Sequence, residues 1–197
     1  EMLQNVEMGY RLNAKGFRGG INGYAMLYKD QLIVTGKIND VGEYIRQNVP
    51  DSYRLGVELD ARIPVTPRLA WSTTLALSRN RIRNFTEYID DYDNGGQIVN
   101  HYSDTDIAFS PGVVAAGELS YRPADKIELA LISRYVGRQY LDNTSSESRR
   151  IDPFFVSDLR ARYNTSLGKV NNIGVTLLVY NLFSELYEAN GYTFSYR

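Results

Sequence analysis

The chain lacks several residue types on which whole classes of protein depend. It has no cysteine among 197 residues, which excludes disulfide scaffolds, thiolate metal sites and thiol catalysis. Its only histidine, His101, leaves little room for a histidine-ligated zinc ion or a serine–histidine triad. Its 22 basic and 23 acidic side chains nearly cancel. Because proteins that coat nucleic acid need a cationic surplus, we expect no nucleic-acid partner.

Long apolar runs are missing as well. No stretch approaches the roughly 18 consecutive apolar residues of a membrane-spanning helix, and the most apolar run, residues 175–180, has strand-type composition. There is no proline-rich or glycine/serine-rich linker and no long run of one charge, so one domain over residues 1–197 is the simplest organisation. Tyrosine is in excess, at 16 residues against 7 phenylalanines. Tyrosine is favoured in strands and at boundaries between oil and water.

Apolar and polar residues alternate with a period of two through most of the chain. The pattern is clearest over residues 53–63, where the odd positions are apolar and the even positions are Arg, Gly, Glu, Asp and Arg. Such a segment has one apolar face as a strand and none as a helix. Several of the runs exceed the usual five to six residues of a strand. We predict eight strands, over residues 6–12, 17–30, 53–63, 69–82, 113–121, 127–140, 155–163 and 173–182.

The connections between these strands alternate in length. Short ones with turn-type residues lie near 13–16, 64–67, 122–126 and 168–171. Longer polar ones lie near 31–50, 86–106, 141–152 and 183–191. An antiparallel up-and-down meander with short turns at one end and long loops at the other is typical of outer-membrane barrels. A soluble sandwich more often mixes loop lengths and uses Greek-key crossings. The pattern favours an all-β membrane barrel.

In a barrel the apolar face would contact lipid and the polar face would line an aqueous lumen. Opposite charges on neighbouring strands could pair there, and so many ionic groups imply a wide lumen. The alternation alone would also fit the solvated face of a soluble antiparallel sheet. The charged residues expected on the polar face are Arg54, Glu58, Asp60, Arg62, Glu128, Arg134, Arg138, Asp158, Arg160 and Arg162.

Aromatic residues fall into two groups along the predicted strands. Two such clusters separated by aliphatic residues are typical of the girdles that mark both membrane interfaces. The alternative is packing inside a soluble β core. The group near the short turns is Tyr10, Phe17, Trp71, Tyr121 and Tyr163. The group near the long connections is Tyr28, Tyr53, Phe85, Tyr135, Phe155, Tyr180 and Phe183.

The sequence presents no catalytic constellation, so we expect no enzyme, no cofactor and no metal site. Residues 90–96 (Asp-Asp-Tyr-Asp-Asn-Gly-Gly) faintly resemble a calcium loop but lack its ligand spacing and closing glutamate, which favours a solvated loop. His101 has no partner at a motif spacing. The glycines of 16–23 lie within a strand pattern and form no phosphate cradle. Residues 143–145 match a glycosylation triplet, which is meaningless in a bacterial protein.

The order and spacing of several short motifs over nearly the whole chain resemble the C-terminal part of the barrel of TonB-dependent outer-membrane receptors. Each motif is loose by itself, but together and in this order they are specific. They are Tyr28-Lys29-Asp30-Gln31-Leu32 followed by Thr35-Gly36, residues 52–60 and 77–82, Phe109-Ser110-Pro111-Gly112, residues 133–144, Asp158-Leu159-Arg160, and Tyr180-Asn181-Leu182-Phe183 followed by Tyr187 and Asn190-Gly191-Tyr192.

The resemblance implies a share of a 22-stranded barrel that a plug domain occludes in the bacterial outer membrane. Such receptors bind scarce nutrients (ferric siderophores, haem, cobalamin or glycans), and the TonB complex acts on a box ahead of the plug. Residues 1–197 would be a partial barrel without plug, TonB box or final strand, because one more strand is expected from Tyr192 onward. The expected partners are outer-membrane lipid, a small-molecule or glycan ligand and the TonB complex. With two unpaired edges, the fragment is expected to self-associate.

Two other functions remain open from the sequence. One is a complete small outer-membrane barrel with an adhesive or structural role. The other is a soluble β-rich enzyme or binding domain. No single residue can be assigned to ligand contact. The arginines and tyrosines of 31–50, 86–106 and 141–152 are candidates only as a group.

Overall fold

A computed structural model describes residues 1–168 and 170–194. Every regular element in these ranges is a strand, so the all-β prediction is confirmed, and no helix there has the length and apolar character to span a membrane. The predicted turn near 168–171 and the strand expected after Tyr192 include residue 169 and residues 195–197, which lie outside the described residues. The strands are β1 (Met2–Ala14), β2 (Phe17–Ile38), β3 (Tyr44–Thr66), β4 (Leu69–Asp90), β5 (Gln97–Asp106), β6 (Val113–Ala124), β7 (Ile127–Val136), β8 (Gln139–Tyr140), β9 (Arg150–Ile151), β10 (Phe154–Leu167) and β11 (Val170–Val179).

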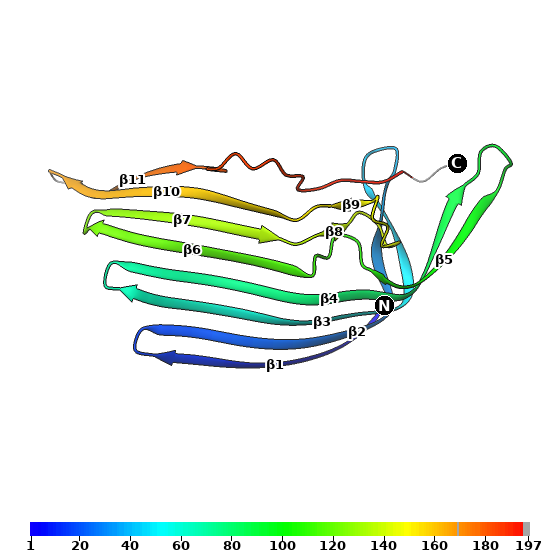
Figure 1. The fold of residues 1–197 in the computed structure, drawn as a ribbon, viewed down its shortest axis with the longest axis horizontal. Coiled ribbons are helices and arrows are strands. Elements are labelled where there is room, and N and C mark those ends of the chain that lie inside the picture. The colour runs from blue at the N-terminus through cyan, green and yellow to red at the C-terminus, as the bar shows by residue number, and fades with distance from the viewer. Residues whose placement is uncertain (169, 195–197) are drawn as a thin grey trace.

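Eight of these strands form the predicted antiparallel meander, in the order β1-β2-β3-β4-β6-β7-β10-β11. β5 pairs with the far part of β4, and β8 pairs with β9 in a small separate sheet. Figure 1 shows the meander as one curved layer with all its short turns at one end and all its long connections at the other. Among the described residues β1 and β11 form the two edges of the sheet and do not pair with each other.

The register of the ladder separates an apolar face from a polar face, because directly paired residues point to the same side of a sheet. Val57 pairs with Gly23 and Leu77 on the apolar face, and the next residue, Glu58, pairs with Asn22 on the polar face. The apolar face is bare: Met8, for example, is 83% exposed. This exposure is what a lipid-facing surface requires, since water would oppose it.

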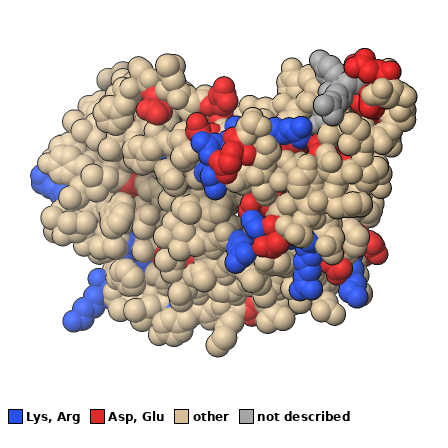
Figure 2. Space-filling model, turned by 45° about the vertical axis from the view of Figure 1, so that its right-hand side comes forward, with Lys and Arg blue, Asp and Glu red and all other residues tan. Residues whose placement is uncertain are grey.

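Charged residues of the polar face pair across neighbouring strands, as predicted, and also across one intervening strand. The Arg160 guanidinium lies 3.6 Å from the Glu128 carboxylate on the neighbouring β7 and 2.9 Å from that of Glu118 on β6, one strand further. Figure 2, which brings the long-connection end forward, shows basic and acidic side chains next to each other there as well. Arg138 was wrongly predicted to lie on this face. β7 ends at Val136, so Arg138 lies in the connection that follows and pairs there with Glu147.

The aromatic residues predicted near the short turns lie on the apolar face, where Tyr10, Trp71 and Tyr121 are exposed. The second group is less uniform than predicted. Phe85 is 4% exposed and belongs to a buried cluster, because β4 continues past it and pairs with β5. Tyr28 pairs with Ser52 on the polar face.

Two of the four long connections are mostly strand, which the sequence-based boundaries missed. β2 continues to Ile38 and β3 begins at Tyr44, so most of 31–50 is a ladder that extends beyond the meander. β4 likewise continues to Asp90 and pairs with β5. Figure 1 shows both hairpins turning away from the direction of the meander strands, towards the side of the layer where β10 and β11 lie. They give the long-connection end a folded structure of its own.

Candidate functional site: the long-connection end

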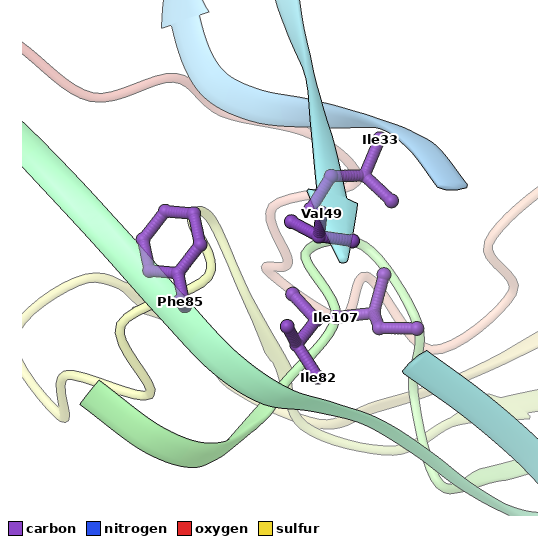
Figure 3. Packing of buried hydrophobic residues seen from close by; sticks show 5 residues of the cluster. All are labelled: Ile33, Val49, Ile82, Phe85 and Ile107. Carbon is purple, nitrogen blue, oxygen red and sulfur yellow. The ribbon is translucent and has the colours of Figure 1, made fainter. Parts of the chain in front are cut away.

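Segments far apart in the sequence meet at the long-connection end around a small apolar core. Ile33, Val49, Ile82, Phe85 and Ile107 are each at most 5% exposed, and Tyr102 packs against them. Figure 3 shows these side chains converging from the two hairpins and from the link that follows β5. Burial of such side chains contributes about 1.5–3 kcal/mol each, which holds the hairpins against one another.

Asn143 joins this core to the connection between β7 and β10. Its side chain is fully buried, accepts a hydrogen bond from the Ala108 amide (2.8 Å) and donates one to the Val34 carbonyl (2.8 Å). A buried backbone group without a partner costs about 1–3 kcal/mol, so the Asn143 side chain satisfies one backbone group of β2 and one of the link that follows β5. Gly36 lies against the same segment, and a Cβ at this position would come 2.2 Å from the Leu141 carbonyl oxygen.

A charged network ties the β4–β5 hairpin to the same connection. The Arg149 guanidinium donates to Glu87 at 2.8 Å and to Asp142 at 2.7 Å, and both carboxylates are nearly buried. Burial alone would raise the pKa of Glu87, but hydrogen bonds from Arg149, Tyr102 and Asn100 outweigh it and lower that pKa. Burial and the bond to Glu87 together raise the pKa of the Tyr102 hydroxyl. Glu87 is therefore a carboxylate at neutral pH.

The link between β5 and β6, residues 107–112, crosses the polar face of the sheet. The Arg54 guanidinium donates to the Ser110 hydroxyl at 3.1 Å, and the Ser78 hydroxyl donates to the Pro111 carbonyl at 3.2 Å. The Phe109 ring packs edge-on against Tyr44 of β3 at 5.5 Å. Polar-face side chains thus hold this link over the end of the sheet.

A cavity of about 250 Å³ opens between the two hairpins and the β7–β10 connection. Its wall combines charged and amide groups with rings, from Lys37 and Gln47 on one hairpin and Glu87 and Tyr88 on the other. The Lys37 ammonium donates to the Tyr88 carbonyl at 3.0 Å. A few oriented polar groups in a partly apolar hollow are the general form of a small-molecule site.

The arginine and tyrosine candidates do not form one cluster. The Tyr44 hydroxyl donates to the Gly191 carbonyl at 2.8 Å, Arg46 is exposed, and Arg150 forms ion pairs with Glu147 and Asp152. Tyr88 lines the cavity. Arg149 and Tyr102 are engaged in the network around Glu87. Tyr92 is 76% exposed at the β4–β5 tip, away from the cavity. The carboxylates and amides of the cavity wall were not predicted from the sequence. Residues 142–145 (Asp-Asn-Thr-Ser) carried the one available signal, because such residues favour side-chain-to-backbone turns.

The remaining sequence features are placed outside this cavity. His101 forms a hydrogen bond with Thr86 on the paired strand. The Asp91 carboxylate accepts hydrogen bonds from Asn94 and so stabilises the β4–β5 turn. No group of three His, Cys, Asp or Glu residues suited to a metal ion occurs among the described residues. Asn143 is too buried to serve as a glycosylation site.

An exposed apolar face, a charge-paired opposite face and long connections gathered at one end define the wall of a membrane β-barrel. The chain belongs to the TonB-dependent receptor-like β-barrel family, which matches residues 1–182. This is a family of transport receptors that reside in the bacterial outer membrane.

Solved structures of such receptors share the fold of the chain. It is similar to the siderophore receptor PiuA from Acinetobacter baumannii, with a TM-score of 0.70, 17% identity and coverage of 96% of this chain and 25% of that one. It is similar to the ferric yersiniabactin uptake receptor FyuA from Yersinia pestis, with a TM-score of 0.69, 17% identity and coverage of 98% and 26%. It is also similar to the copper transporter OprC, with a TM-score of 0.66, 18% identity and coverage of 94% and 25%.

The chain thus spans about a quarter of the length of these structures. No curated protein matches it at a significant level. At these identities the likeness concerns the fold and not the transported ligand.

Proposed function

We propose that this chain forms part of the barrel of an outer-membrane receptor that takes up a scarce nutrient and is powered by the TonB complex. Its membership of the family supports this function. Its open sheet supports the partial-barrel interpretation, because β1 and β11 each leave one edge unpaired among the described residues. The rest of the barrel would pair with those edges, and a plug domain outside residues 1–197 would carry the contact with TonB.

The observation that carries the proposal is the cavity between the two hairpins and the β7–β10 connection. The Arg149 ion pairs and Asn143 fix the surrounding segments, so the cavity wall is organised before a ligand arrives. Pre-organisation lowers the ordering cost of binding. In the assembled receptor this cavity would form part of the outer ligand-capture surface.

The ligand is a metal or a metal chelate in this proposal. PiuA is a siderophore receptor, FyuA takes up ferric yersiniabactin and OprC is a copper transporter. The tyrosine ring and amide groups of the cavity can contact the organic part of a chelate, and the mixed wall charges do not select for one ligand sign. The ligands to compare are therefore a ferric catecholate, ferric yersiniabactin and Cu²⁺.

The test is uptake by cells that carry the complete receptor as their only route for these three ligands. Tyr88→Ala removes a half-exposed ring from the cavity wall, and Tyr88 is not a member of the buried cluster. We expect at least a tenfold loss of uptake at limiting concentration for the transported ligand. Tyr92→Ala, on the same hairpin but outside the cavity, should transport normally. Equal uptake by both variants would contradict a role for the cavity, and no TonB-dependent uptake of any of the three ligands would contradict the proposed function.

A further inference from the structure

The apolar face contains a groove near the short turns that the transport function does not use. The groove has a volume of about 520 Å³ and runs across β1 to β4. The rings of Tyr10, Phe17 and Trp71 line it, together with Ala61 and Leu75. Its volume lies within the roughly 300–1,000 Å³ of ordinary small-molecule sites.

Lipid surrounds this face in the barrel, so an apolar occupant gains little from hydrophobic burial alone: bulk lipid is as apolar as the groove. Selection of one occupant therefore depends on how well its shape fits the groove and on how its polar headgroup interacts with the protein at the end of the groove. The aromatic rings lie in the girdle, where lipid headgroups begin.

Positively charged side chains lie at the end of the groove next to the short turns. The first three short turns, residues 15–16, 67–68 and 125–126, each contain one cation, and Asp125 is the only acidic residue in them. Lys15 directly follows β1 and lies two residues before Phe17, and Arg68 directly precedes β4, three residues before Trp71. The two turns are neighbours, since a Cβ on Gly16 would lie 3.3 Å from Pro64 at the end of β3.

Both cations are accessible to a headgroup. Lys15 and Arg68 are exposed. One nitrogen of the Arg68 guanidinium donates to the Pro123 carbonyl at 3.0 Å. A guanidinium has five N–H donors in all, and a phosphate readily accepts two of them.

We propose that this groove binds an anionic phospholipid of the inner leaflet of the outer membrane, with one acyl chain between the aromatic rings and the phosphate at Lys15 and Arg68. Short turns face the periplasm in outer-membrane barrels, which places the site in that leaflet. Anionic headgroups complement a basic turn region, with about a fivefold gain in affinity for each cation near the surface. The proposal depends on the barrel's membrane placement and not on the transported ligand.

Trp71, the only tryptophan of the chain, reports on the groove directly. The complete protein is reconstituted into vesicles that contain phosphatidylglycerol or phosphatidylcholine with brominated acyl chains, which quench nearby tryptophan fluorescence. The same protein with Trp71→Phe gives the background from any other tryptophan. We expect phosphatidylglycerol to quench Trp71 at a several-fold lower mole fraction than phosphatidylcholine, and high salt to reduce the difference.

The variants separate headgroup recognition from general lipid contact. Lys15→Gln and Arg68→Gln should each reduce the preference for phosphatidylglycerol about fivefold. Arg83→Gln, which removes an exposed cation in the part of β4 remote from the short turns, should leave the preference unchanged. Ala61→Phe fills the groove and should weaken quenching by both lipids. Ala161→Phe adds the same bulk to the apolar face of β10, outside the groove, and should leave quenching by both lipids unchanged.

Equal quenching by the two lipids would overturn the proposal. So would a phosphatidylglycerol preference that survives both turn substitutions. The two turn substitutions lie on exposed residues outside the strands, so they test the site even if Ala61→Phe fails to fold.

Discussion

Individual polar residues at the long-connection end join segments that the backbone ladder leaves apart. Glu87 accepts hydrogen bonds from the Arg149 guanidinium at 2.8 Å and the Tyr102 hydroxyl at 2.9 Å, with a side chain only 7% exposed. A carboxylate held in this way is stabilised in its charged form, so protonating it weakens the fold around it. Asn143 also joins separate segments by hydrogen bonds but carries no charge, so its contribution to stability does not depend on pH.

The lowered pKa of Glu87 predicts that acid weakens the packing of the β7–β10 connection against the β4–β5 hairpin. Because the folded-state pKa lies below the ordinary value of about 4.3, the stabilisation is complete above that value and is lost as pH falls through the folded-state pKa. Glu87→Gln should accelerate proteolysis within 141–152 at pH 7, consistent with the loss of a charged hydrogen bond of roughly 1.5–3 kcal/mol. The difference from the unsubstituted protein should vanish in strong acid.

Glu43→Gln is the matched control for this change, since Glu43 is an exposed glutamate on the neighbouring β2–β3 hairpin. It should be cleaved like the unsubstituted protein at every pH. Limited proteolysis with an acid-tolerant protease, followed by mass spectrometry of the cut sites, provides the measurement. A difference between Glu87→Gln and the unsubstituted protein that persists undiminished in acid would contradict the assignment.

At the scale of elements, the eight meander strands were predictable because each is a local pattern. Residues 53–63 alternate so regularly that only a strand gives them a consistent face, and β3 covers them. The hairpin extensions were not predictable in this way. Residues 44–50 contain polar residues and Pro50, which lacks an N–H and is unfavourable inside a ladder. The structure tolerates Pro50 because the Asn48 side chain donates to the Asp30 carbonyl at 2.7 Å instead.

The candidate site was beyond prediction for a related reason. Asn143 bonds Val34, 109 residues away in the chain, and the cavity wall joins the two hairpins to the β7–β10 connection. No local pattern encodes which of several polar connections will pack together. The grouping of the long connections at one end was predictable from their alternation with short turns, but the residues that meet there were not.

Gly36 tests whether the contact between the β2–β3 hairpin and the β7–β10 connection holds the site together. Its φ is +86°, and Gly42 in the same hairpin has a φ of +84° with no atom within 4 Å of an added Cβ. Both alanine variants incur the left-handed penalty of about 1–2 kcal/mol. Only Gly36→Ala also collides with the Leu141 carbonyl, so it alone should separate the two segments.

Hydrogen exchange of the Ala108 amide, which donates to Asn143, measures that separation. We expect exchange to be at least tenfold faster in Gly36→Ala than in Gly42→Ala. Equal rates in the two variants would show that the β7–β10 connection is held without this contact.

The molecule as a whole has two features that a soluble domain does not tolerate. Its apolar face leaves large side chains bare along most strands, among them Met8 at 83% and Leu177 at 62% exposed. Its edge strands β1 and β11 each present one unpaired side among the described residues. The first requires lipid, detergent or another apolar surface, and the second requires another strand. Detergent can satisfy only the first requirement.

Residues 1–197 expressed alone should therefore self-associate even in detergent. We expect size-exclusion chromatography with light scattering to show oligomers in detergent and larger aggregates without it. Arg11→Pro removes a backbone N–H donor from the edge strand β1, and Met8→Lys places a charge on the exposed apolar face of the same strand. Both variants should reduce the pairing of β1 with other copies of the chain in detergent. Leu119→Lys, on the apolar face of the inner strand β6, is the control and should leave the detergent oligomer intact. A stable monomer of the unsubstituted chain in detergent-free buffer would contradict the prediction. Such a monomer could not have both an exposed apolar face and unpaired edge strands.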